Sequence, residues 1–291
     1  MEFVKILQQL RNPFFDFLFN FISFLGEPVV IVLILCILYW CVNKRKSEKL
    51  IFILIGSMAF NDSIKNFIRI ERPWILDNTV TSLRPDTATG YSFPSGHTQF
   101  TASLYSSLIL LFKKRWIYIL GTVLIILMPL SRMYLGAHTF WDILAALILG
   151  IGLAVLFSFI YDKICDKSPM YLLIFLIPLA FVVIALLPFW NEKPPITKDS
   201  FKIIGIAFGG IIGIVTEKMK IGFSEKADFK TNLIKLIIGI SGILIIQLGL
   251  KFLFSFTPEG VSEYLSIIRY FAITIWATLG MGFIIKKIFN R

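Results

Sequence analysis

Two histidines are present in this chain, and each lies in a short polar segment beside a long apolar run. His138 and Asp142 are four residues apart, so on a helix their side chains face each other one turn apart. A carboxylate that bonds one imidazole nitrogen fixes the tautomer, leaves the other nitrogen free to attack, and stabilises the cation that forms. The pair therefore predicts a histidine nucleophile. The alternative is a buried hydrogen bond that only tethers helices.

The second histidine follows a segment that is suited to binding an anion. Ser95 and Gly96 precede His97 at the start of an apolar run, where serine can cap a helix and glycine lets the backbone approach a ligand. The free N–H groups and the positive end of a helix attract anions. His97, in the first turn, could donate a proton to a leaving oxygen. The alternative is an ordinary helix cap with an incidental histidine.

Cations accompany both segments. Lys65, Arg69 and Arg72 are spaced to share one face of a helix, which Pro73 ends at the membrane surface. Such a cluster needs an anion, or else its side chains extend to the lipid headgroups. Arg132 can clamp phosphoryl oxygens with two parallel hydrogen bonds. Together the clusters predict phosphate chemistry at a membrane surface.

The composition describes a membrane protein. The chain is 57% hydrophobic and 16% charged, and its apolar runs leave no room for a sizeable soluble domain. The net charge of +11 comes from basic residues in short loops, which orient a membrane protein, so nucleic acid is not expected as a partner. The three cysteines form neither a disulfide framework nor a metal site.

Hydropathy predicts about nine spanning helices. Residues 13–25 are too short to span alone, and we interpret them as an interfacial or re-entrant helix, with a tenth span as the alternative. Basic loops lie on one side of this topology, which places residues 70–96 and 131–138 on the extracytoplasmic side. The predicted spans are residues 28–42, 48–69, 97–112, 116–130, 139–160, 170–189, 201–216, 231–255 and 265–286.

Taken together, the three segments are far more specific than any one alone. Lys65-x6-Arg72-Pro73, Pro94-Ser95-Gly96-His97 and Ser131-Arg132-x5-His138-x3-Asp142, in this order, resemble the three-part signature of the type 2 phosphatidic acid phosphatase superfamily. The resemblance covers residues 65–142. It implies an all-α, polytopic transmembrane helical bundle with a six-helix phosphatase core and extra C-terminal helices, about nine to ten spans. We expect an N-terminal segment 1–27, a catalytic core 28–165 and C-terminal helices 166–291.

The resemblance also implies a role for each motif residue. His138 attacks phosphorus and becomes a phosphohistidine, while Asp142 orients it and stabilises its charge. His97 protonates the leaving oxygen and then activates water. No metal and no other cofactor is expected, because fixed cations and backbone donors can stabilise the transferring phosphoryl group. The residues that would hold the phosphoryl oxygens are Lys65, Arg72, Ser95, Gly96 and Arg132.

The resulting hypothesis is a multi-pass lipid phosphatase of the plasma membrane with an extracytoplasmic site. The tail of its lipid phosphate substrate would stay in the bilayer. Undecaprenyl diphosphate, phosphatidic acid and phosphatidylglycerol phosphate are the expected substrates. Two alternatives stay open: a lipid phosphotransferase that uses the same phosphohistidine, and a non-catalytic lipid or anion transporter. The sequence leaves the oligomeric state undetermined.

Overall fold

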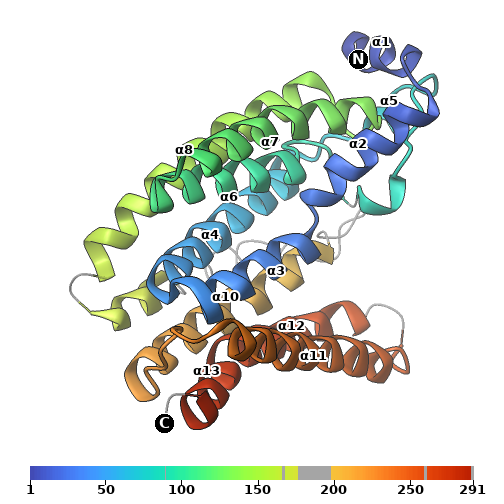
Figure 1. Ribbon diagram of the computed structural model, residues 1–291. Helices are drawn as coiled ribbons and strands as arrows, with labels where there is room; N and C mark the ends of the chain where they lie inside the picture. The colour runs from blue at the N-terminus through green and yellow to red at the C-terminus, as the bar shows by residue number, and fades with distance from the viewer. Residues whose placement is uncertain (89, 166–167, 176–197, 259–260, 290–291) are drawn as a thin grey trace. The chain divides into compact units, whose positions relative to one another are not determined.

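The computed structural model describes residues 1–88, 90–165, 168–175, 198–258 and 261–289, and every regular element in these ranges is helical (Figure 1). The expected all-α fold is therefore confirmed. The chain divides into two compact units. Unit 1 comprises residues 1–32 and 56–159, and unit 2 comprises residues 33–55 and 160–291.

Unit 1 contains the helices that carry the three sequence motifs. Asn12 caps α2 with its side chain, which accepts a hydrogen bond from the backbone N–H of Phe15 at 3.1 Å. Pro13 fits the first position of that helix because its missing N–H would have no partner there. The elements are α1 (Glu2–Gln9), α2 (Pro13–Leu25), the first half of α3 (Pro28–Ile37), the second half of α4 (Lys44–Ile68), α5 (Pro73–Leu76), the 3-10 turn η2 (Pro85–Thr87), α6 (Gly96–Phe112), α7 (Arg115–Tyr134) and most of α8 (Phe140–Cys165).

Polar contacts join α4, α6 and α8 within unit 1. Gln99 donates to the Ser57 carbonyl at 2.9 Å and accepts from Asn61 at 2.8 Å. Ser103 donates to the Gly150 carbonyl at 2.9 Å. A Cβ at Gly150 would lie 2.6 Å from the Gln99 carbonyl oxygen, so glycine is required where α6 and α8 approach. Buried hydrogen bonds and small residues at such contacts hold membrane helices together, and here they position both histidine motifs.

Unit 2 packs around a buried tryptophan. The Trp40 side chain is fully buried and donates from Nε1 to the Ala277 carbonyl at 2.8 Å. Lys218 pairs with the buried Glu48 at 2.7 Å. The remaining elements are the π-helical turn η1 (Leu38–Val42), the 3-10 turn η3 (Pro169–Phe175), α10 (Lys198–Lys220), α11 (Phe229–Phe254), α12 (Val261–Ile275), the π-helical turn η5 (Trp276–Gly280), α13 (Met281–Ile284) and the π-helical turn η6 (Ile285–Phe289).

Among the described residues, six segments are long and apolar enough to cross a membrane. Pro13–Leu25 and Pro28–Val42 pass the same test only as a pair bent by 49°, which fits a broken span or a re-entrant loop. The expected span 97–112 corresponds to α6, and most of the expected span 170–189 lies outside the described residues. The six segments are Lys44–Leu76, Arg115–Tyr134, Phe140–Lys163, Asp199–Lys220, Phe229–Phe254 and Val261–Phe289.

Candidate active site

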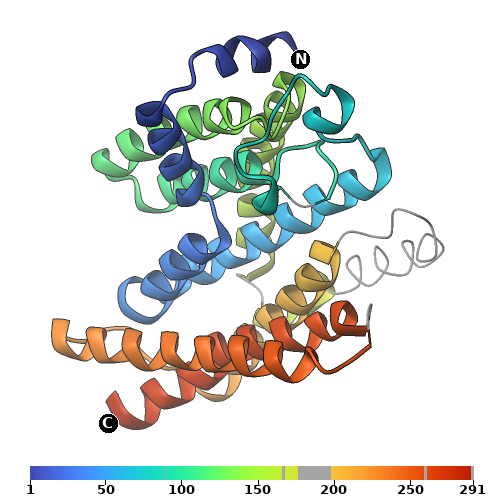
Figure 2. The same ribbon diagram turned by 90° about the vertical axis from the view of Figure 1, so that its right-hand side faces the viewer.

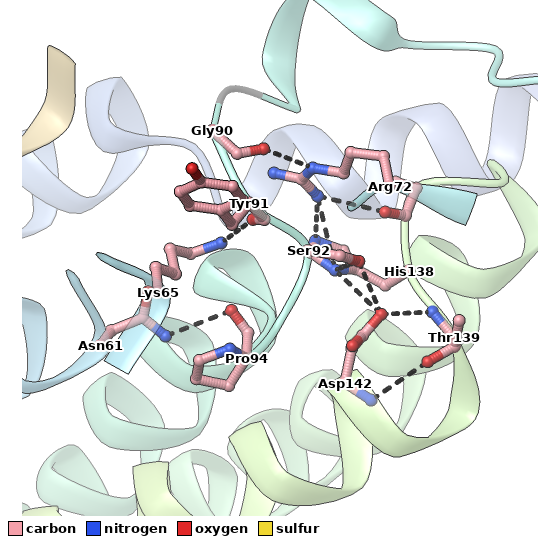
Figure 3. Close-up of polar contacts among 11 residues, drawn as sticks. Asn61, Lys65, Arg72, Gly90, Tyr91, Ser92, Pro94, His138, Thr139 and Asp142 are labelled. Carbon is pink, nitrogen blue, oxygen red and sulfur yellow. Dashed lines mark hydrogen bonds and ion pairs between the residues drawn. The ribbon is translucent and has the colours of Figure 1, made fainter. Parts of the chain in front are cut away.

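His138, two residues before α8 begins, and Asp142, in the first turn of α8, lie side by side, and their side chains are buried (Figure 3). His138 Nδ1 is 3.7 Å from Asp142 Oδ2. The same carboxylate oxygen accepts hydrogen bonds from the Ser92 hydroxyl and from the Thr139 backbone N–H, both at 2.7 Å. Three groups therefore surround one oxygen, and the carboxylate is held with its charge toward the imidazole.

Contacts of His138 define its tautomer. Arg72 Nη1 lies 2.9 Å from His138 Nε2, and a guanidinium group can only donate. The same Nη1 lies 3.4 Å from Nδ1, so the shorter contact assigns the acceptor role to Nε2 and places the ring proton on Nδ1, facing Asp142. His138 lies between the spans that contain α7 and α8. Burial, together with the charge of Arg72, lowers the pKa of this imidazole well below its ordinary value of 6.5. Both effects favour the neutral imidazole, whose lone pair the Arg72 contact places on Nε2.

Backbone carbonyls orient the cations of the first motif. Arg72 donates from Nε to the Gly90 carbonyl at 2.9 Å and from Nη1 to the Ala137 carbonyl at 3.1 Å. The Lys65 ammonium group donates to the Tyr91 carbonyl (Figure 3). Both side chains are largely buried. The segment at residues 90–92 therefore holds both cations and also supplies the Ser92 hydroxyl to Asp142.

A shared helical face does not bring Lys65 and Arg72 together, contrary to the sequence prediction. Helix α4 ends at Ile68, and Arg69 adopts a left-handed conformation with φ of 57°. Arg72 then has extended backbone and precedes the short helix α5. Arg69 Nε donates to the Asn66 carbonyl at 2.8 Å. The two cations converge because the chain turns away from α4 and the 90–92 segment binds both of them.

Arg132 is fully buried near the end of α7. Its Nη1 donates to the Ser23 hydroxyl at 2.6 Å, while Nε and Nη2 have no hydrogen-bond partner among the described residues. Leaving donors of a buried charge unpaired is costly unless an anion accepts from them. Arg132 therefore has two donors available for a phosphoryl group.

The Ser95–His97 segment begins α6 beside the same carboxylate. Ser95 N donates to the Asp142 backbone carbonyl at 3.1 Å, which joins the second motif to the third. The Ser95 side chain does not cap the helix as predicted, and within the described residues its hydroxyl has no partner. His97 Nε2 also lacks one there, and electrostatic interactions connect His97 to Arg132, His138 and Arg72. The N–H of Gly96 lies at the positive end of α6.

Ser23 and Ser92 are the site residues that sequence reasoning missed. Ser92 stands next to the second motif, and its proximity was the only signal in the sequence. Ser23 lies on α2, more than one hundred residues before Arg132, in a segment rich in phenylalanine. A buried hydroxyl in so apolar a helix needs a partner, which was the available signal, but nothing local identified Arg132 as that partner.

Replacing Ser23 with alanine is expected to lower kcat about tenfold, because Arg132 loses a charge-assisted hydrogen bond that aims its free donors. The matched control is Ser131→Ala. Ser131 is equally buried and adjoins Arg132, but its hydroxyl donates to the Met128 carbonyl within its own helix at 2.8 Å. Steady-state kinetics on both variants would measure the difference. Equal losses in the two variants would argue against a positioning role for Ser23.

Comparison with known proteins connects these segments to one family. Residues 48–166 match the sequence model of the PAP2 superfamily, and residues 201–289 match that of the PAP2 superfamily phosphatase transmembrane extension. The chain is 26% identical over 227 residues to a dihydrosphingosine 1-phosphate phosphatase of Schizosaccharomyces pombe, an alignment that covers 72% of this chain and 54% of that protein. It therefore spans about half the length of that relative.

Two further relatives are shorter. An undecaprenyl-diphosphatase of Sulfolobus acidocaldarius is 27% identical over 157 residues, covering 54% of this chain and 75% of that one. The crystal structure of Aquifex aeolicus LpxE is 26% identical and superposes with a TM-score of 0.49, over 54% of this chain and 92% of that chain. Both matched segments belong to models of one superfamily, and the first segment contains every residue of the buried site except Ser23. This chain is therefore a multi-span membrane protein of the PAP2 superfamily.

Proposed function

We propose that this protein is a membrane lipid phosphatase that works through a phosphohistidine intermediate and needs no metal ion. The observation that carries the proposal is the geometry around His138. Its Nε2 lies 2.9 Å from the Arg72 guanidinium, its Nδ1 faces Asp142, and the buried Arg132, which has two donors without a partner among the described residues, belongs to the same unit. A nucleophile activated by an oriented partner and surrounded by cations is suited to attack a phosphate.

In the first step, His138 Nε2 attacks phosphorus and the bond from phosphorus to the lipid oxygen breaks. His97 gives its proton to that leaving oxygen. Asp142 stabilises the positive charge that develops on the imidazole. Arg72 must first leave Nε2, and its guanidinium then turns to the phosphoryl oxygens, which offer a stronger, charged acceptor.

In the second step, water replaces the histidine. His97, now neutral, takes a proton from the water as its oxygen attacks phosphorus. The bond between phosphorus and Nε2 breaks, and inorganic phosphate leaves. Lys65, Arg72 and Arg132 stabilise the charge on the phosphoryl oxygens in both steps, together with the Ser95 hydroxyl and the Gly96 N–H.

The substrate is a lipid phosphate whose tail stays in the bilayer. The named relatives act on sphingoid phosphates and on undecaprenyl diphosphate, so both monoesters and diphosphates belong among the proposed substrates, with phosphatidic acid and phosphatidylglycerol phosphate. The basic segments at the ends of spans, which include residues 44–49 at the start of α4 and residues 113–115 between α6 and α7, support a site on the extracytoplasmic face of the plasma membrane.

Phosphate release in detergent micelles with EDTA tests this function. Wild-type protein would be offered the four substrate types, and we expect release from at least one. Release that needs added metal would contradict the metal-independent mechanism. Product that appears on an added acceptor lipid in place of free phosphate would identify a phosphotransferase. No turnover of any lipid would favour transport.

The pH dependence of kcat/KM should reflect the lowered pKa of His138. Protonated Nε2 cannot attack, so activity falls as pH drops through the folded-state pKa, which lies below 6.5. Protonation of His138 should thus cause no loss of activity at pH 6.5, whereas loss of the proton that His97 donates lowers the rate as pH rises. The phosphate group of the substrate also titrates, and phosphorus NMR would measure its pKa so that its effect on the pH profile can be subtracted. An acid limb whose half-maximal rate lies at or above pH 6.5, after that correction, would contradict the lowered pKa of His138.

A further inference from the structure

Helix α1 has two faces of opposite character. Phe3, Ile6 and Leu10 share one side of the helix, and 58%, 54% and 55% of their surfaces are exposed. Val4 points inward and is fully buried. An apolar side of this size on a helix whose other side is packed marks a contact with lipid or with a partner.

Polar side chains on the other face of α1 bind the segment at residues 77–81. Lys5 pairs with Asp77 at 2.7 Å. Gln8 donates to the Thr79 carbonyl at 3.3 Å, and its side-chain oxygen accepts from the Thr81 backbone N–H at 2.7 Å. Lys5 and Gln8 are three residues apart, which places both on the side away from Ile6. One face of α1 is therefore occupied by protein, and more than half of each apolar side chain on the opposite face stays exposed among the described residues.

Arg11, just after α1, joins the same segment to the end of α7. It donates from Nη1 to the Thr81 hydroxyl at 2.6 Å. From Nη2 it donates to the Thr81 carbonyl at 2.8 Å and to the Tyr134 carbonyl at 3.0 Å. One guanidinium group thus holds two backbone segments together.

The segment held by α1 packs directly against the turn before His138. Leu83 N donates to the Leu135 carbonyl at 3.0 Å. Gly136 has φ of 74°, and a Cβ there would lie 2.4 Å from the Thr81 carbonyl oxygen. No side chain fits between them, so Thr81 limits where Gly136, and with it His138, can move.

The position of α1 identifies the bilayer as the occupant of its apolar face. Its partners lie where spans end or begin: Asp77 follows the span that ends at Leu76, Tyr134 ends another, and Phe3 stacks on Phe140 at 5.3 Å. Figure 2 shows α1, in dark blue, at the same end of unit 1 as the segment in cyan. Phe140 in turn contacts the exposed Trp141 at 5.5 Å, and Phe14, Phe17 and Phe21 of α2 are exposed as well. Trp141 belongs to a residue type that is enriched at membrane interfaces.

We propose that α1 is an interfacial helix, with Phe3, Ile6 and Leu10 inserted at the boundary between headgroups and acyl chains, and that it positions the turn at Gly136 through residues 77–83. The membrane surface of α1 stands independently of the proposed function. Its positioning effect on His138 rests on that function, so the two are tested by separate measurements.

Cysteine labelling in lipid nanodiscs that hold one copy of the chain tests the membrane surface. A membrane-impermeant maleimide would be applied to Leu10→Cys and to the neighbouring, exposed Gln9→Cys, with wild type as the blank for native cysteines. We expect Leu10→Cys to react at least about tenfold more slowly, because the bilayer shields a side chain at that position. Equal rates would overturn the proposal. Protection that appears only in vesicles crowded with protein would also overturn it, because a second copy would then be the occupant.

Kinetics test the positioning role. Arg11→Ala should lower kcat on the order of tenfold with little change in KM, because a small displacement of the nucleophile slows attack. Arg11→Lys, which keeps one donor for the Thr81 carbonyl, should recover part of the loss. Gln8→Ala provides the second test if Arg11→Ala does not fold. An unchanged kcat in the folded variants would overturn the positioning role, and an inactive wild type would instead count against the proposed function, while the labelling result would stand.

Discussion

Replacing His138 with alanine is expected to reduce phosphate release by at least about 10⁴-fold, because no other group can take the place of the nucleophile. The side chain is buried with Nε2 beside Arg72, so water cannot attack from the same position with the same orientation. Phosphate release from a lipid phosphate in micelles, with EDTA present, would measure the loss. Circular dichroism and thermal unfolding would verify that the variant folds.

His97→Ala is the matched control, because it removes the other histidine and keeps the nucleophile. With a phosphate ester that has a good leaving group, His97→Ala should form the phosphoenzyme and hydrolyse it slowly, since only the second step then needs a base. Radioactive phosphate should accumulate on that variant as an acid-labile, base-stable label, and it should be absent from His138→Ala. A label that persists in His138→Ala would place the nucleophile elsewhere.

Asp142→Asn is expected to lower kcat by about 10³–10⁴-fold, the range that follows when an orienting carboxylate is neutralised beside a catalytic histidine. Asparagine has almost the same size and can still accept from the Thr139 N–H, but it carries no charge to stabilise the phosphorylated imidazolium. An amide at position 142 can also donate to His138 Nδ1, so the imidazole proton is no longer held on that nitrogen. Single-turnover kinetics of phosphoenzyme formation would measure the effect on the first step.

Ser92→Ala separates the charge of Asp142 from its hydrogen bonds. This change removes one donor at 2.7 Å and leaves the carboxylate charged and bonded to Thr139. The expected loss is about tenfold, the cost of a hydrogen bond to a charged group. If Ser92→Ala were as damaging as Asp142→Asn, the position of the carboxylate would matter more than its charge.

The sequence by itself determined the features that depend on neighbouring residues: the membrane-spanning runs and the spacing within each motif. The hydrophobic runs predicted an all-α membrane bundle, and the spacing within each motif predicted the family, and both are confirmed. The predicted roles of the eight site residues remain predictions, although all eight lie in unit 1. These features could be predicted because a helix relates residues three or four positions apart, and because apolar length alone decides whether a segment can span.

The contacts between distant segments were decided by the tertiary structure alone. Spacing predicted one helical face for Lys65 and Arg72, but the left-handed backbone at Arg69 ends that helix, and carbonyls at residues 90–91 bind both cations. Ser23 meets Arg132, and Arg11 meets Thr81, across separations that no local periodicity encodes. A buried charge takes whichever hydroxyl or carbonyl the packing of the helices brings to it, so these partners became visible only when the helices were placed together.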